Sequence, residues 1–197
     1  MKKRTWKPGT LIYPLPAIMV SCGDIDGEKN IITISWTGTI CSNPPMCYIS
    51  IRPERHSYKI ITNSKEFVIN LTTKELAYAT DFCGVKSGKD IDKFKTLNLT
   101  PQKATIVKCP MVAESPLNIE CKVIEIKKLG SHDMFIAEVV AVNAAERLFN
   151  ETTDAFDLNS EQLLAYSHGN YLTNSKEIGK FGFSVMKNKT KKRLNNK

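Results

Sequence analysis

The stretch SWTGTICSNPPMCYISIRPERHSY, which begins at Ser35, carries side chains that could bind a planar and negatively charged molecule. Trp36 offers a large ring, and Gly38 lies in a strand-like run, where a glycine often marks a close approach to the backbone. Arg52 and Ser57 follow the next strand-like run, and a guanidinium presents a planar fork of donors that suits a phosphate. A ring site next to a phosphate site predicts a ligand of mononucleotide size.

Short strands must position these side chains. Runs rich in β-branched residues alternate with Gly, Asp and Pro turns, which is typical of antiparallel strands. Several short strands with only one or two helices predict a closed or nearly closed antiparallel barrel. The expected strands cover 17–22, 30–36, 46–51, 67–71, 104–108, 118–129 and 133–143, and short helices are expected within 57–63, 74–82 and 84–100.

The net charge of +8 comes from the two ends of the chain. Residues 187–197 carry six positive charges and no negative one, and residues 1–7 carry four more, so the body between them is slightly acidic. A nucleic-acid site would instead spread its basic residues over one face of the folded body. We therefore expect no nucleic-acid partner, with weak adhesion of the tails to nucleic acid or anionic lipid as the alternative. The expected organisation is a basic N-terminal segment over 1–13, one domain over 14–186 and a basic disordered tail over 187–197.

The cysteines and the hydropathy pattern argue against a metal-binding, a membrane-spanning or a secreted protein. The six cysteines form no C-x-x-C pair and no ligand pair has zinc spacing, so we expect reduced thiols and no metal site. No apolar run approaches the length of about 18–20 residues that crosses a bilayer. The basic start is interrupted by Pro8 and Gly9, unlike a signal peptide. The sequence therefore predicts a cytoplasmic protein without a membrane partner.

Four segments carry a family resemblance: NIITISWTGTICSNPPMCYISIRPERHSY, FVINL, TDFCGVKSGKDIDKF and GSHDMFIAEVVAV. In order and spacing they resemble the flavin reductase-like family, and most of all its flavoredoxin branch. The resemblance runs from about Pro14 to Val185, nearly the whole expected domain. It implies a mainly β fold with short helices, an antiparallel and Greek-key-like split β-barrel that binds FMN.

The resemblance also implies which residues contact FMN. Trp36 and Thr37 would lie beside the isoalloxazine ring, with the backbone of Gly38 and Thr39 bonding its edge. Asn30 matches a polar position on the flavin side of the same hairpin. Taken alone, Trp36 would more often be a core or surface aromatic, so its assignment depends on the motif around it.

The phosphate end and the second loop complete the implied site. Ser50 and Arg52, with His56 and Ser57, would hold the ribityl chain and the phosphate, although an arginine at a strand end can also be a solvated surface charge. The remaining expected contacts are Asp81, Cys83, Gly84, Ser87, Lys93 and His132. Lys93 would bring a cation to the ring, His132 could be an ordinary turn residue, and Cys83 could be a buried packing residue.

No side chain has to act as a nucleophile or as a strong acid or base, because FMN itself carries the redox chemistry. The resemblance implies an FMN-dependent oxidoreductase that accepts hydride or electrons from NAD(P)H or a redox protein. The sequence has no G-x-G-x-x-G fingerprint, so a nicotinamide would dock only transiently. The alternative is an FMN-binding electron carrier without NAD(P)H turnover. We also expect a homodimer with the flavin near the subunit interface.

Overall fold

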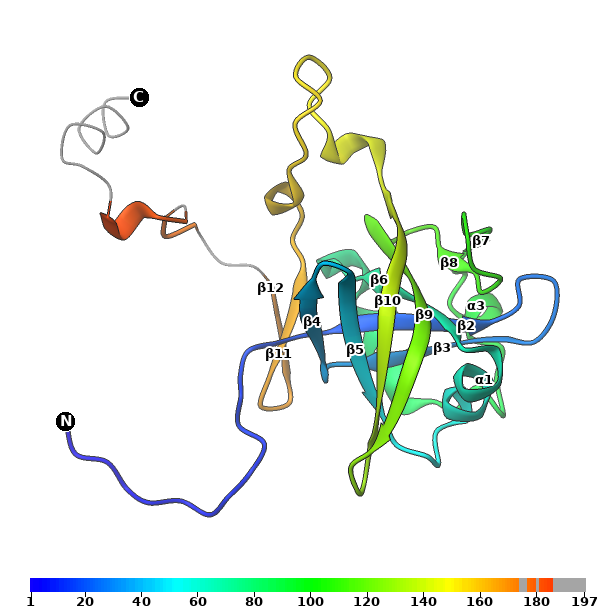
Figure 1. Cartoon of the computed structure of the whole chain (residues 1–197), viewed down its shortest axis with the longest axis horizontal. Helices are drawn as coiled ribbons and strands as arrows, with labels where there is room; N and C mark the ends of the chain where they lie inside the picture. The colour runs from blue at the N-terminus through cyan, green and yellow to red at the C-terminus, as the bar shows by residue number, and fades with distance from the viewer. Residues whose placement is uncertain (174–176, 180, 186–197) are drawn as a thin grey trace.

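One antiparallel sheet dominates the computed structural model, which describes residues 1–173, 177–179 and 181–185. Its strands are β2 (Ile18–Gly23), β3 (Lys29–Ile34), β4 (Thr37–Ser42), β5 (Pro45–Ile51), β6 (Glu66–Leu71), β9 (Leu117–Lys128) and β10 (Asp133–Ala144). They are ordered β3-β2-β6-β9-β10-β5-β4 (Figure 1). The expected basic tail over 187–197 lies outside the described residues.

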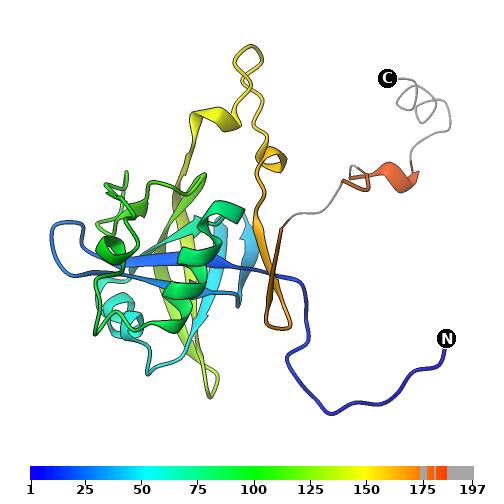
Figure 2. The same cartoon turned by 180° about the vertical axis from the view of Figure 1, so that it is seen from behind.

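Short helices and two small sheets surround this main sheet. The helices α2 and α3 pack on β3, and α1 packs on β2 (Figure 2). Within the described part of the chain, no helix is long and apolar enough to span a bilayer. The helical elements are α1 (His56–Ser64), η1 (Lys74–Leu76), α2 (Ala77–Val85), α3 (Lys93–Thr96), η2 (Glu146–Leu148), η3 (Leu158–Ser160) and η4 (Phe183–Val185). The small sheets contain β1 (Leu15–Pro16), β11 (Leu164–Ser167) and β12 (Asn170–Thr173), and β7 (Pro101–Gln102) and β8 (Met111–Val112).

The mainly β prediction is confirmed, and of the closed or nearly closed barrel that was expected, full closure is not formed. The edge strands β3 and β4 lie at opposite ends of the strand order and do not pair with each other. Only Ser35 and Trp36 separate these two strands in the sequence, so the two edges of the sheet meet at that corner. The result is an open seam at the ends of β3 and β5, and this seam contains the candidate site described below.

The core of the main sheet is built from the alternating side chains of its strands. Val20, Ile49, Phe67 and Phe135 are fully buried in one cluster, as expected where β-branched and aromatic residues face inward. Two buried cysteines belong to the same cluster: the Sγ atoms of Cys47 on β5 and Cys121 on β9 lie 3.5 Å apart.

The expected strand over 104–108 is not formed, because a buried carboxylate takes its N–H groups. Glu120 is fully buried and accepts hydrogen bonds from the backbone of Thr105 at 2.7 Å and Val107 at 3.0 Å, and also from Ile106 at 2.7 Å. Burial alone would raise the pKa of Glu120, but these donors together lower it. The segment therefore wraps around an ionised carboxylate instead of pairing with a strand.

Candidate functional site

Two adjoining pockets, each of about 240 Å³, lie where the open seam meets α1 and α2. We call the first the seam pocket; it is lined by residues 32–36, 50–52, Arg55, Gly84 and His132. The second, the helix pocket, is lined by residues 54–57, 85–88, Asn30, Ile32 and Lys93. The two pockets share Ile32 and Arg55, so they form two parts of one elongated site.

An aromatic pair stands at one end of the seam pocket. The rings of Trp36 and His132 lie 4.4 Å apart between centroids at an interplanar angle of 41°. The carbonyl oxygen of Trp36 accepts a hydrogen bond from the Ser50 N–H at 2.9 Å, which fixes this corner of the chain against β5. Burial, and to a lesser degree the charge of Arg52, lowers the pKa of His132. His132 is therefore mainly neutral at pH 7 and can both donate and accept hydrogen bonds.

The residues that follow Trp36 support this corner without lining either pocket. The Thr37 hydroxyl donates to the Tyr48 carbonyl oxygen at 2.6 Å. A Cβ atom at Gly38 would lie only 3.2 Å from the Tyr48 ring, so this close packing favours glycine. Thr39 is exposed beside an irregularity in the pairing of β4 with β5. These residues therefore place Trp36 rather than reach into the pockets themselves.

The N-terminus of α1 opens on the helix pocket. The helix begins at His56, and the side chain of the preceding Arg55 does not cap it. The amide of Asn30 donates to the hydroxyl of the buried Ser57 at 2.8 Å, which joins the first turn to β3. A Cβ atom at Gly88 would lie 2.1 Å from the Asn30 side-chain oxygen, so the loop after α2 closes tightly against this pair. Free N–H groups and the helix dipole favour an anion at such a position.

Arg55 connects the two pockets and was not among the expected site residues. Its Nη2 donates to the carbonyl oxygen of Gly84 at 2.6 Å, so the guanidinium is held between the end of α2 and the start of α1. Arg52 lies in the seam pocket with an exposed side chain, 3.4 Å from the Glu54 carboxylate. Arg55 could have been suspected from its place immediately before a helix start, but the contact with Gly84 requires the tertiary structure.

Lys93 is buried beneath the helix pocket. Its ammonium group donates to the carbonyl oxygens of Ile31 at 2.7 Å and Cys83 at 2.9 Å, and only 2% of the residue is exposed. Burial lowers the pKa of Lys93. Burial also raises the pKa of the Cys83 thiol to about 11, so this thiol stays protonated at neutral pH. Lys93 thus ties β3 to α2, while its charge stays close to the pocket.

The structure brings most, but not all, of the expected site residues together. Trp36, Ser50, Arg52, Gly84 and His132 line the seam pocket, and Asn30, His56, Ser57, Ser87 and Lys93 line the helix pocket. Thr37, Gly38, Thr39, Asp81 and Cys83 line neither of them. Asp81 is exposed on α2, where it interacts with Tyr171.

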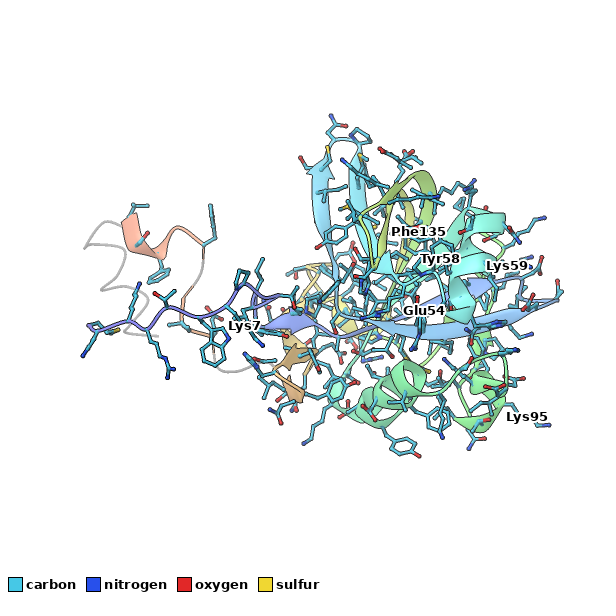
Figure 3. All side chains as sticks on the ribbon, turned by 90° about the horizontal axis from the view of Figure 1, so that it is seen from below. Lys7, Glu54, Tyr58, Lys59, Lys95 and Phe135 are labelled. Carbon is cyan, nitrogen blue, oxygen red and sulfur yellow. The ribbon has the colours of Figure 1, made fainter. Side chains whose placement is uncertain are left out.

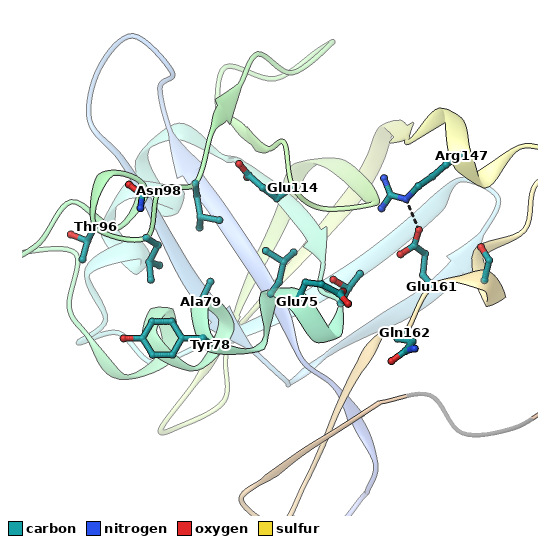
Figure 4. A pocket seen from close by; sticks show the side chains of 14 residues that line it. Glu75, Tyr78, Ala79, Thr96, Asn98, Glu114, Arg147, Glu161 and Gln162 are labelled. Carbon is teal, nitrogen blue, oxygen red and sulfur yellow. Dashed lines mark hydrogen bonds and ion pairs between the residues drawn. The ribbon is translucent and has the colours of Figure 1, made fainter.

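A larger cavity of about 830 Å³ shares no residue with this site. Glu75 and Glu114 face it, and Arg147 pairs with Glu161 at 2.8 Å at one side of it (Figure 4). Its aromatic residue, Tyr78, is largely exposed. The cavity combines one guanidinium with several carboxylates, so it does not suit a phosphate.

The family profile named "Flavin reductase like domain" matches residues 10–175. The chain belongs to this family. The resemblance seen in the four sequence segments is therefore confirmed, and it extends over most of the described residues. The family assignment supports a flavin-related redox role for the protein.

The chain is also similar to individual proteins. The structure of the flavoredoxin of Desulfovibrio vulgaris (Miyazaki F) superposes with a TM-score of 0.85 at 28% sequence identity, over 94% of this chain and 100% of that one. An uncharacterised protein of Pyrococcus abyssi is 32% identical over 71% of this chain and 79% of its own length. The reductase component of a 4-nitrophenol monooxygenase from Rhodococcus opacus is 25% identical over 60% of each chain.

Proposed function

We propose that this protein is an FMN-binding oxidoreductase that holds the flavin ring in the seam pocket and the phosphate in the helix pocket. The observation that carries the proposal is the pairing of the two pockets through Arg55. One pocket has an aromatic wall formed by the rings of Trp36 and His132, and the other has a helix N-terminus with nearby cations. A ligand with a planar ring at one end and a phosphate at the other fits both.

The ring end would be held mainly by Trp36 and His132. Their rings provide a surface on which a flat heteroaromatic system can stack. The hydroxyls of Ser35 and Ser50 line the same pocket and can bond polar atoms at the ring edge. Arg52 adds a positive charge at this end, which stabilises negative charge on a bound ring.

The phosphate end would be held by the start of α1. The N–H groups of the first turn, the hydroxyl of Ser57 and the ring of His56 lie at the helix pocket, and Arg55 supplies a charge-assisted donor. This arrangement favours Arg55 over Arg52 as the phosphate ligand, because the Arg52 side chain pairs with Glu54. Lys93 contributes positive potential from below without leaving its two carbonyl partners.

The bound FMN would supply the redox chemistry by taking up electrons as a hydride or singly. The residues of this chain bind the ring, orient it and place positive charge beside it. The name of the Rhodococcus relative, a reductase component, favours an enzyme that takes hydride from a transiently docked NAD(P)H. The likeness to a flavoredoxin favours the second candidate, an electron carrier without NAD(P)H turnover.

A flavin titration followed by a nicotinamide assay tests the proposal. We expect the purified protein, or its apo form after FMN is added, to show the visible absorption spectrum of bound FMN. Steady oxidation of NADH or NADPH in the presence of FMN would support the reductase. Binding of FMN without such turnover would support the carrier, and failure to bind either FMN or riboflavin would contradict both.

We also propose a homodimer in which the partner covers the open side of the seam pocket. The exposed apolar residues near this side support the proposal, since Trp36 is 37% exposed and Ile40 on the edge strand β4 is 44% exposed. We expect sedimentation at micromolar concentration to give a dimer. A monomer that still holds FMN under these conditions would contradict the proposal.

A further inference from the structure

A short hydrogen bond joins α1 to the beginning of β10. The hydroxyl of Tyr58 donates to a carboxylate oxygen of Asp133 at 2.5 Å, and Asp133 is only 4% exposed. The rings of Tyr58 and Phe135 pack edge to face, with centroids 5.3 Å apart and planes at 81°. Figure 3 shows Tyr58 and Phe135 next to each other, with Lys59 pointing outward from the same helix. Packing on Phe135 therefore helps to hold the Tyr58 ring in the position from which its hydroxyl reaches Asp133.

The two partners belong to different halves of the site. Tyr58 follows His56 and Ser57 in the first turn of α1, and those two residues line the helix pocket. Asp133 follows His132, which lines the seam pocket and contacts the ring of Trp36. Between α1 and β10, this is the one side-chain hydrogen bond found in the described part of the chain.

We infer that Tyr58 and Asp133 are a positioning pair that sets the distance between the ring site and the phosphate site. The inference rests on the proposed function. A ligand held at both ends gains from its second contact only when the spacing of the two sites matches its own length. A bond that fixes the first turn of α1 to the residue after His132 keeps that spacing constant.

The bond remains intact over the neutral pH range. The Asp133 carboxylate, as the acceptor, raises the pKa of Tyr58, so the phenol keeps its proton at neutral pH. The ionisable groups nearest this pair in the sequence are His56, Lys59 and His132, and the last is mainly neutral at pH 7. Tyr58 therefore remains the donor of this hydrogen bond at neutral pH.

The Tyr58→Phe variant tests this role, because it keeps the ring against Phe135 and removes only the hydroxyl. We expect its Kd for FMN to rise about tenfold while its Kd for riboflavin changes less than about twofold, since only FMN has the phosphate. Asp133→Asn keeps an acceptor oxygen and should retain most of the preference for FMN. The matched control is Tyr78→Phe, whose exposed ring lies at the larger cavity and should change neither Kd.

Each result decides between specific alternatives. Equal weakening of both flavins, with a lower Tm, would show that the bond serves stability alone and would overturn the inference. Unchanged affinity of the Tyr58→Phe variant for both flavins would overturn it as well. If the wild-type protein binds neither flavin, then the proposed function fails instead, because the inference presupposes an FMN site.

Discussion

The Arg55→Ala variant is expected to bind FMN on the order of 10- to 150-fold more weakly than the wild type. The loss for riboflavin should be much smaller, because riboflavin lacks the phosphate that the guanidinium would bind. Arg55 is suited to this role by its place between the two pockets and by its 2.6 Å bond to Gly84, which holds the side chain in position. Titration of both flavins into the apo protein measures the difference.

Arg52→Ala is the matched control for this experiment. Arg52 lies three residues away in the same loop, but its side chain is exposed and pairs with Glu54. We expect this variant to weaken both flavins slightly and to keep the preference for FMN over riboflavin. The opposite pattern, with the preference lost in Arg52→Ala and kept in Arg55→Ala, would contradict this assignment. It would identify Arg52 as the phosphate ligand, as the family resemblance first implied.

A second large effect is expected for Lys93→Met, this time on stability. The substitution keeps most of the buried stem but leaves the carbonyl oxygens of Ile31 and Cys83 without their donor. We expect the free energy of unfolding to fall by about 2–4 kcal/mol, because two buried acceptors lose a charged partner. Urea denaturation of the apo protein measures this loss without interference from bound flavin.

The control is Lys95→Met in the same helix. The Lys95 side chain points outward at the edge of the molecule (Figure 3) and is exposed. Its replacement should change the free energy of unfolding by less than about 0.5 kcal/mol. Similar values for the two variants would mean that the Lys93 ammonium does not hold β3 to α2.

The sequence was sufficient to predict two pairs of strands that lie close together in the chain. The hairpin of β2 and β3 and the pair β9 and β10 both follow from alternating patterns with turns between them. The segment 104–108 has the same β-branched character, but its N–H groups bind Glu120, which no local pattern reveals. Local sequence patterns do not predict the open seam either, because it depends on which distant strands pair.

The candidate site was also predicted in part: residues within one stretch of sequence were found, and contacts that depend on the tertiary structure were not. Trp36 and Ser57 were found from one dense stretch of sequence, and both line the site. Arg55 was missed because its role depends on the end of α2 lying beside the start of α1. Lys93 was expected near the flavin ring, yet its ammonium is fixed to two backbone carbonyls, a contact that spans 62 residues in one case.

The thiol contact in the core affects how the protein should behave in air. The strand β10 lies between β5, which carries Cys47, and β9, which carries Cys121, so the two thiols reach each other across an intervening strand. Both side chains are buried, and the susceptibility of a thiol to oxidation follows its exposure, so dissolved oxidants reach this pair slowly. A flavin reductase-like chain thus keeps two adjacent thiols in its interior, where the sheet shields them from the solvent.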